Sequence, residues 1–349
     1  MSTTNPPGHP GEPITTGAQE LVNVGGHATT SEGEQGVSEL AGLEGGLGGD
    51  GLGGDGGDGP VDLDASLYDV GPSRSLLADA WRRFRRNRLA MFGLFLVIFL
   101  LIVAIVGPFV VRDPLDAGGL SRERPTNQHW FGTDRLGRDV FARVVYGVRL
   151  SLFIGFVATA VETLIGIVVG AIAGWFRGWS DTILMRFVDI LLGIPYFVLA
   201  LVMVTIIGKG LSAVIITLAI TAWLQTARTV RAGFLQVREL EYVEAAKAIG
   251  VPTKRIIVRH VLPNVFQPVI VLVAVGIGSA ILAEAALSFL GVGISDPTPS
   301  LGLMVSQAQT EVTTSFYLLF FPAMGIVITV LGFLLVGDGL RDALDVKDT

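Results

Sequence analysis

Residues 89–111 read LAMFGLFLVIFLLIVAIVGPFVV, an apolar run without a single charged side chain. At a rise of about 1.5 Å per residue, a helix of this length crosses the hydrocarbon core of a bilayer, which is about 30 Å thick. Five arginines stand just before the run: Arg82, Arg83, Arg85, Arg86 and Arg88. Because basic residues are retained on the cytoplasmic side, the pattern predicts a spanning helix that starts in the cytoplasm.

The composition of the whole chain agrees with a membrane protein. Half of the 349 residues are hydrophobic, only 16% are charged, and the mean hydropathy is +0.61. Such a chain is too apolar for one soluble core. The sequence has no cysteine, which excludes disulfide frameworks, thiolate metal sites, iron–sulfur clusters and cysteine nucleophiles.

The N-terminal part has a different composition from the rest. Residues 1–73 contain twelve Asp or Glu, nineteen Gly and no Lys or Arg, whereas residues 74–349 contain all 25 basic residues. A Gly-rich acidic segment with few large apolar side chains cannot bury enough surface to offset the entropy lost on ordering. We therefore expect residues 1–73 to form a disordered cytoplasmic tail and residues 74–349 to form the functional domain.

Five further apolar runs are long enough to span a bilayer, at about residues 150–175, 183–208, 211–227, 264–292 and 317–340. Six spans put both termini on the same side of the membrane. Residues 228–263, between the fourth and fifth spans, carry seven Lys or Arg, so the positive-inside rule puts this segment and both termini in the cytoplasm. The predicted fold is an all-α membrane protein with six transmembrane helices.

Two of the predicted spans contain a glutamate, Glu162 near the middle of the second and Glu284 in the fifth. A charged side chain in a span costs roughly 2.5–3.5 kcal/mol on insertion scales, so each glutamate should face protein or water. Each also lies on a stripe of small residues that suits close helix contact: Ala158, Gly166, Gly170 and Gly174 for the first, and Gly276, Ala280 and Ser288 for the second. Glu162, Glu284 and Ser288 therefore either line a translocation path or make buried hydrogen bonds that fix the packing. In the third span, Asp189 is expected to pair with Arg186 on the same helix.

The predicted cytoplasmic segment, residues 237–263, has a distinctive local pattern. Residues 237–249 are strong helix formers, and Gly250 follows at the position of a left-handed terminating residue. Residues 253–261 are expected to form a second short helix that Pro263 stops. Two short helices with small side chains at the bend suit either a docking surface for another protein or a helix lying in lipid headgroups.

The residues of this segment resemble a known family. Glu244-Ala245-Ala246, then Gly250 and then His260-Val261-Leu262-Pro263 are similar to the EAA loop of binding-protein-dependent ABC import permeases. Three further elements resemble the C-type subunit of the dipeptide/oligopeptide/nickel permease family. They are TDRLGRD at 133–139, EAALSFLG at 284–291 and GDGLRD at 337–342. The resemblance covers about residues 74–349 and implies the six-helix bundle of a type I ABC importer permease.

This resemblance also implies partners and residue roles. The chain would be half of a heterodimeric pore, together with a B-type sister permease, two cytoplasmic ATPase subunits and an extracytoplasmic substrate-binding protein. Within residues 237–263, which would be the coupling segment, Glu244 would pair with charges of an ATPase groove and Gly250 would form the bend. The rest of the implied ATPase-coupling set is Ala245, Ala246, His260, Leu262 and Pro263. Ala142 and Leu301 depart from the family's usual Ser and Trp, which puts details of receptor docking or substrate in doubt.

The sequence offers no sign of chemistry in the chain itself. It has no G-x-x-x-x-G-K-[ST] phosphate-binding loop, so ATP and Mg are expected to bind the partner subunits and no cofactor is expected here. We assign no catalytic residue, no metal ligand and no nucleic-acid partner. The favoured function is a permease that imports short peptides or a related small solute. The alternatives are an ion-gradient-driven carrier or channel that uses Glu162 and Glu284, and a membrane scaffold without transport activity.

Overall fold

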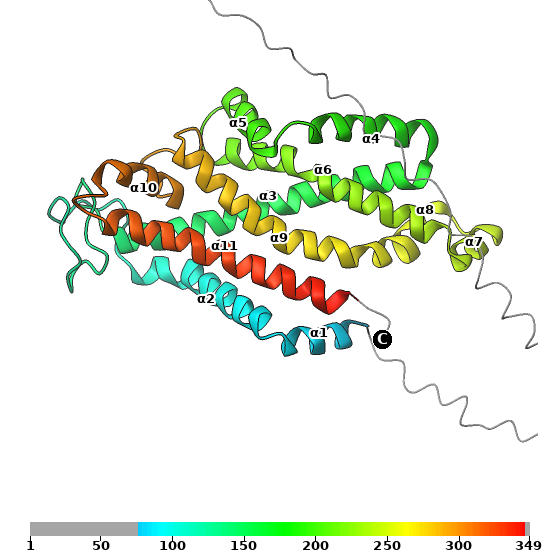
Figure 1. Cartoon of the computed structure of the whole chain (residues 1–349), viewed down its shortest axis with the longest axis horizontal. Helices are drawn as coiled ribbons and strands as arrows, with labels where there is room; N and C mark the ends of the chain where they lie inside the picture. The colour runs from blue at the N-terminus through cyan, green and yellow to red at the C-terminus, as the bar shows by residue number, and fades with distance from the viewer. Residues whose placement is uncertain (1–75, 346–349) are drawn as a thin grey trace, which may run out of the picture. The chain divides into compact units, whose positions relative to one another are not determined.

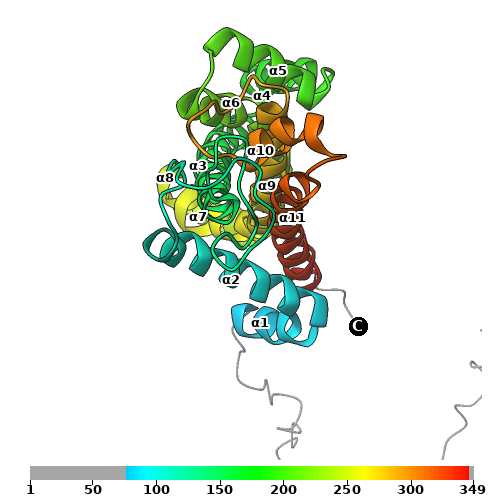
Figure 2. The same cartoon turned by 90° about the vertical axis from the view of Figure 1, so that its left-hand side faces the viewer.

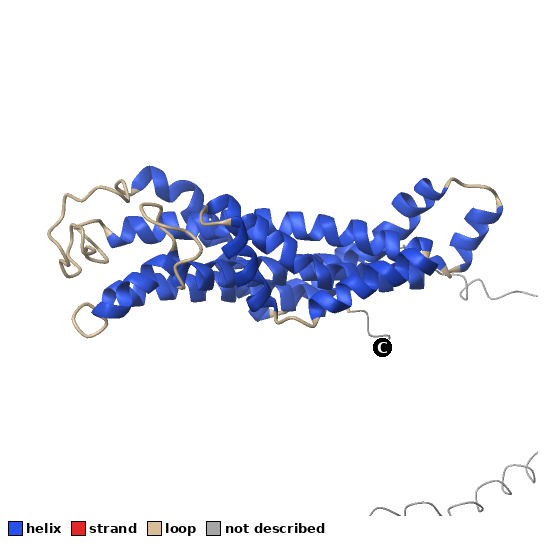
Figure 3. Ribbon diagram, turned by 90° about the horizontal axis from the view of Figure 1, so that it is seen from above, coloured by secondary structure: helices blue, strands red, loops and turns tan. Residues whose placement is uncertain are grey.

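The computed structural model describes residues 76–345, and the predicted tail of residues 1–73 lies outside them. Regular secondary structure in the described part is helical, apart from an isolated β-bridge between Thr133 and Asp139 (Figure 3). The first helices are α1 (Leu76–Arg86), α2 (Arg88–Val110), α3 (Val140–Phe176), α4 (Gly178–Leu192), α5 (Tyr196–Ile207) and α6 (Leu211–Arg238). They are followed by α7 (Glu241–Ala248), α8 (Thr253–Ile256), a π-helical turn (Ile257–Val261), α9 (Leu262–Phe289), α10 (Leu301–Ala308), a 3₁₀ turn (Gln309–Glu311) and α11 (Tyr317–Leu344). The all-α prediction is confirmed for these residues.

Five helical stretches are long and apolar enough to cross a membrane. They are α2, α3, α6, α11 and the continuous stretch Thr253–Phe289, which joins α8, the π-helical turn and α9. Helices α4 and α5 meet the same criteria as a pair, but they are bent by 93° at a short break. The structure therefore has six spans when this bent pair is counted as one broken span.

Helix α3 lies in the middle of the bundle and packs against both α6 and α9 (Figure 1). Its glycines allow α6 to approach closely. A Cβ added at Gly166, Gly170 or Gly174 would lie 2.5–2.6 Å from an atom of α6, which is closer than real Cβ atoms come. The small-residue stripe of the second span therefore faces α6, as a helix-contact stripe should.

The remaining long helices flank this centre. Helices α4 and α5 lie on one side of α3, and α1 and α2 lie on the other (Figure 2). Helix α2 turns large apolar side chains outward; for example, Phe95 is 62% exposed and Phe109 is 86% exposed. An apolar face of this kind on a spanning helix is suited to lipid or to another membrane subunit.

The predicted third span, residues 183–208, is not one continuous helix in the structure. The chain leaves the helix at Gly193 and re-enters it at Tyr196, and the two halves meet at 93°. Pro195 explains the break, because proline has no N–H to donate and disfavours the helical conformation of the residue before it.

The predicted partner of Asp189 is wrong. Its carboxylate accepts a hydrogen bond from Arg228 of α6 and none from Arg186.

Several helix ends differ from those predicted. Helix α3 starts ten residues before the predicted span, because Asp139 caps it by accepting a hydrogen bond from the Ala142 N–H at 2.9 Å. Helix α6 continues past residue 227 to Arg238 and takes up the start of the predicted cytoplasmic segment. The bundle thus has two distinct ends, one with α7 and one with α10 (Figure 1).

Candidate functional site

The segment between α6 and α9 folds as a small anchored projection at the α7 end of the bundle. Val243 of α7, Ile256 of α8 and Val261 of the π-helical turn are buried in one cluster with Phe234 and Trp175. The guanidinium group of Arg238 donates to the backbone oxygen of Trp175 and lies over its ring, 5.6 Å from the centroid. These contacts hold the segment at a fixed position on α3 and α6.

Gly250 forms the bend between the two short helices. Its φ of +78° is a left-handed conformation that glycine adopts without strain. The Gly250 N–H donates to the Lys247 oxygen at 3.0 Å, and the Val251 N–H donates to the Ala246 oxygen at 3.0 Å. This pair of bonds is a Schellman motif, which ends α7 in the manner that the sequence pattern predicts.

The outward face of α7 presents the residues that the resemblance singles out. Glu244 and Ala245 are exposed and Ala246 is half-buried, while Ile249 at the tip is 81% exposed. Within the described part of the chain, the Glu244 carboxylate has no ion pair or hydrogen bond. The face is therefore a shallow surface with exposed carboxylates at Glu241 and Glu244 and an apolar tip.

The second half of the segment differs from the prediction. His260 is half-buried in the π-helical turn, and Leu262 and Pro263 form the first turn of α9, so the helix does not stop at Pro263. Pro263 is accommodated directly after the π-helical turn, where the Leu262 N–H reaches back to the Ile257 oxygen and interrupts the regular i→i−4 hydrogen-bond pattern. Asn264 ties the two halves of the segment together by donating to the Tyr242 hydroxyl at 3.2 Å.

A second candidate site lies where the broken span meets α3, α6 and α9. It is a pocket of about 490 Å³ with Glu162 in its wall. The Glu162 side chain is buried, and a Cβ added at Gly276 of α9 would lie only 2.9 Å from its Oε1 atom. The polar side chains that share the pocket are those of Tyr196, Thr221, Gln225, Thr226 and Ser279.

Glu284 has different surroundings from Glu162. It is completely buried, and its carboxylate accepts hydrogen bonds from three hydroxyl groups: those of Ser288 at 2.8 Å, Ser300 at 2.8 Å and Ser151 at 3.1 Å. Ser288 also accepts from the Ile294 N–H at 3.0 Å. These hydrogen bonds join α3, α9 and the start of α10. They correspond to the second alternative from the sequence, in which Glu284 and Ser288 make buried hydrogen bonds that fix the helix packing.

Comparison with known proteins identifies the family. Two family models match: that of the binding-protein-dependent transport system inner membrane component, over residues 166–347, and that of the N-terminal TM domain of oligopeptide transport permease C, over residues 75–128. The dipeptide transport system permease protein DppC of Bacillus subtilis (strain 168) is 44% identical over 282 residues, which cover 79% of this chain and 87% of the relative. The chain belongs to this family of binding-protein-dependent permeases.

Two further proteins are similar to this permease. The oligopeptide transport system permease protein OppC of Bacillus subtilis (strain 168) is 42% identical over 277 residues, covering 79% of this chain and 91% of the relative. A chain from an inward-facing structure of the MetNI methionine ABC transporter is 21% identical with a TM-score of 0.49, covering 58% of this chain and 97% of that chain. The family models and the two Bacillus subtilis relatives confirm the family predicted from the EAA loop.

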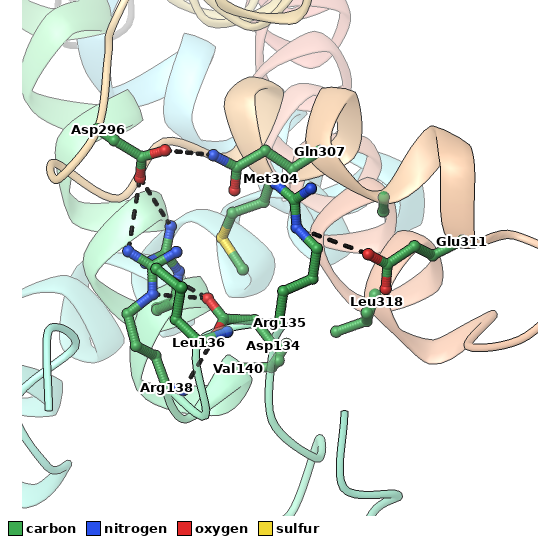
Figure 4. A pocket seen from close by; sticks show the side chains of 12 residues that line it. Asp134, Arg135, Leu136, Arg138, Val140, Asp296, Met304, Gln307, Glu311 and Leu318 are labelled. Atoms are coloured by element: carbon green, nitrogen blue, oxygen red, sulfur yellow. Dashed lines mark hydrogen bonds and ion pairs between the residues drawn. The ribbon is translucent and has the colours of Figure 1, made fainter. Parts of the chain in front are cut away.

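The TDRLGRD element of the permease builds a polar cluster at the α10 end. Asp134 accepts from Arg138 Nε at 2.7 Å, and Asp296 lies 3.5 Å from a guanidinium nitrogen of Arg138 (Figure 4). Glu311 accepts from Arg122 Nε at 2.8 Å, and this bond raises the pKa of Arg122 above its ordinary value. These ion pairs join the loop before α3 to the loop and turn around α10.

The two departures from the family pattern lie inside the permease. Ala142 is 1% exposed on the first turn of α3, and Leu301 is fully buried at the start of α10. A Cβ added at Gly147 would lie 2.8 Å from a Leu301 methyl group, so Leu301 fills space against α3. Neither side chain is available on the surface for a receptor or a substrate.

Sequence reasoning missed most of the pocket around Glu162. Tyr196, Thr221, Gln225 and Ser279 come from α5, α6 and α9, which the sequence alone does not bring together. One signal was present: Pro195 inside an apolar run indicates a broken span, and broken spans are favoured places for binding sites.

Proposed function

We propose that this permease is one subunit of an ATP-driven importer that brings short peptides into the cytoplasm. The names of its relatives support the cargo class, since one is called a dipeptide permease and the other an oligopeptide permease. The single observation that supports the driving mechanism is the exposed α7 face with the EAA loop residues, anchored on α3 and α6 but free on its outer side.

The proposed assembly divides the work among several chains. A B-type sister permease completes the pore, two ATPase subunits bind ATP and Mg, and an extracytoplasmic binding protein delivers the peptide. The α7 end and both termini then lie in the cytoplasm, in line with the seven Lys or Arg of residues 228–263. This permease holds no nucleotide and catalyses no reaction.

In this assembly, the α7 face docks into a groove of one ATPase. Glu244 pairs with basic side chains of the groove, while Ala245 and Ala246 let the groove approach the helix backbone closely. His260, Leu262 and Pro263 continue the docking element into α9. Closure of the ATPases on ATP moves the bundle between inward-open and outward-open states.

Purification from the native membrane in mild detergent tests the assembly. Recovery of the chain with a sister permease and two ATPases, together with ATPase activity that a peptide-loaded binding protein stimulates, is the expected result. Recovery of the chain alone, with uptake driven by an ion gradient, would replace the proposal with a secondary carrier.

Charge reversal on α7 tests the docking role. Glu244→Lys is expected to abolish uptake while the two permeases still assemble, because the exposed side chain makes no hydrogen bond or ion pair within the described residues. Glu241→Lys, three residues earlier on the same face of α7, shows whether the effect is particular to position 244 or follows from any charge reversal on this face. Normal uptake by the Glu244→Lys complex would remove the coupling assignment.

A further inference from the structure

Glu162 is an intramembrane carboxylate without a partner. It is 6% exposed, and within residues 76–345 it makes no hydrogen bond and no ion pair. Glu284, the other carboxylate in a span, accepts from three hydroxyl groups. Because a buried ionised carboxylate without a partner is strongly unfavourable, Glu162 either takes up a proton or binds a cation or donor that the described residues do not supply.

The pocket beside Glu162 has room for that cation. Its volume of about 490 Å³ falls within the range of small-molecule sites. Apolar side chains such as Leu191, Leu199 and Leu272 make up much of the wall, with the hydroxyl and amide groups of the pocket between them. Glu162 is the charged residue in this wall, and no described Lys, Arg or His lines it. The site thus selects for positive charge.

Gly276 makes room for the carboxylate itself. A Cβ added at Gly276 would lie 2.9 Å from Glu162 Oε1, so the carboxylate packs against α9 on that side. On the side of the broken span, Ile194, Pro195 and Tyr196 line the same pocket as Glu162. A ligand in the pocket would therefore meet the carboxylate beside the break between α4 and α5.

We propose that this pocket receives the protonated amino terminus of the cargo peptide, with Glu162 as the carboxylate that binds it. The inference rests on the proposed function as a peptide importer. Every short peptide with a free amino terminus carries the same ammonium group, whatever its side chains. A single carboxylate in a mostly apolar pocket recognises that shared group through a charge-assisted hydrogen bond. It does not distinguish peptides by their side chains.

The absence of cysteine from the chain allows a direct test of the pocket. Ser279→Cys places a thiol in the pocket wall, and Leu282→Cys on the same helix places one on an exposed surface outside it. In the purified complex, a cationic methanethiosulfonate is expected to modify Cys at position 279 at least about tenfold faster than an anionic one, after correction for intrinsic reactivity. Glu162→Gln should remove this preference, and the control at position 282 should show none that depends on Glu162.

Protection from modification identifies the ligand. Trialanine is expected to slow labelling at position 279, whereas N-acetyltrialanine is not, because acetylation removes the positive charge. This comparison uses unchanged Glu162, so it decides the question even if Glu162→Gln prevents assembly. Equal protection by both peptides, or protection by sodium ions or protons alone, would overturn the proposal.

Uptake measurements separate this inference from the proposed function. In vesicles with the reconstituted complex, Glu162→Gln is expected to lower trialanine uptake about tenfold, while ATPase stimulation by the loaded binding protein persists. Glu162→Asp should retain more uptake, and Ser279→Ala serves as an uncharged control in the same pocket. Unchanged uptake with Glu162→Gln refutes the amino-terminus site alone, whereas a wild-type complex that transports no peptide refutes the importer function.

Discussion

The contact between α3 and α6 at Gly170 allows a quantitative test of the packing. A Cβ added there would lie 2.5 Å from the backbone oxygen of Ala227 and 2.8 Å from the Cβ of Val230. Ordinary contact begins at 3.4 Å, so the helices would have to separate locally by about 0.9 Å. Neither atom can move away by a side-chain rotation. Because the closest atom is a backbone oxygen, overpacking here costs about 2–3 kcal/mol, in the upper part of the usual range, and alanine regains about 1 kcal/mol of helix propensity.

Gly170→Ala is therefore expected to lower the free energy of unfolding by about 1–2 kcal/mol, which corresponds to a melting temperature roughly 2–8 °C lower. Thermal melting of the purified complex in detergent measures the change. Gly278→Ala is the matched control, because its Cβ would meet Phe333 Cβ at 3.4 Å and Val330 O at 3.5 Å, both ordinary contacts. A Gly170→Ala complex that melts at or above the wild-type temperature would refute the close-packing argument.

Two further predictions concern the coupling segment and the buried carboxylate. Gly250→Val should reduce uptake per ATP hydrolysed more than Gly250→Asn, because asparagine tolerates the φ of +78° and a β-branched residue does not; equal coupling in the two variants would argue against a role for the bend. Glu284→Leu should lower the free energy of unfolding by at least about 3 kcal/mol, because the hydroxyl groups of Ser151, Ser288 and Ser300 lose their shared acceptor. Chemical denaturation measures the loss, and a change below 1 kcal/mol would show that these bonds add little.

Features that depend on local chemistry could be predicted from the sequence. Long apolar runs reveal spans, because a lipid environment requires them whatever the packing. Gly250 could be assigned to a bend, because the end of a helix and a left-handed residue are both local properties. The family could also be predicted, because the EAA loop residues and their spacing are contiguous in the chain.

Features that depend on distant contacts could not be predicted. The 93° bend leaves the hydropathy of residues 183–208 unchanged, so only Pro195 signals it. Asp189 pairs with Arg228 of another helix, a contact across 39 residues that helical spacing cannot reveal. Glu162 and Glu284 look equivalent in the sequence, each on a stripe of small residues. They differ because Ser151 and Ser300 reach one carboxylate from other elements, while the other faces a pocket.

The continuous helical stretch Thr253–Phe289 has a mechanical consequence. At about 1.5 Å per residue, its 37 residues extend over about 55 Å, from α8 in the projection, through the π-helical turn and past Pro268, to just beyond Glu284. If this stretch tilts as one body about its middle, its two ends move in opposite directions. A tilt of about 10° displaces each end by about 5 Å. The wall residues Leu272, Val275 and Gly276 lie near the pivot, where displacement is smallest. A pull at the α7 end would then open one end of the bundle while it closes the other, and the pocket at Glu162 would stay almost still.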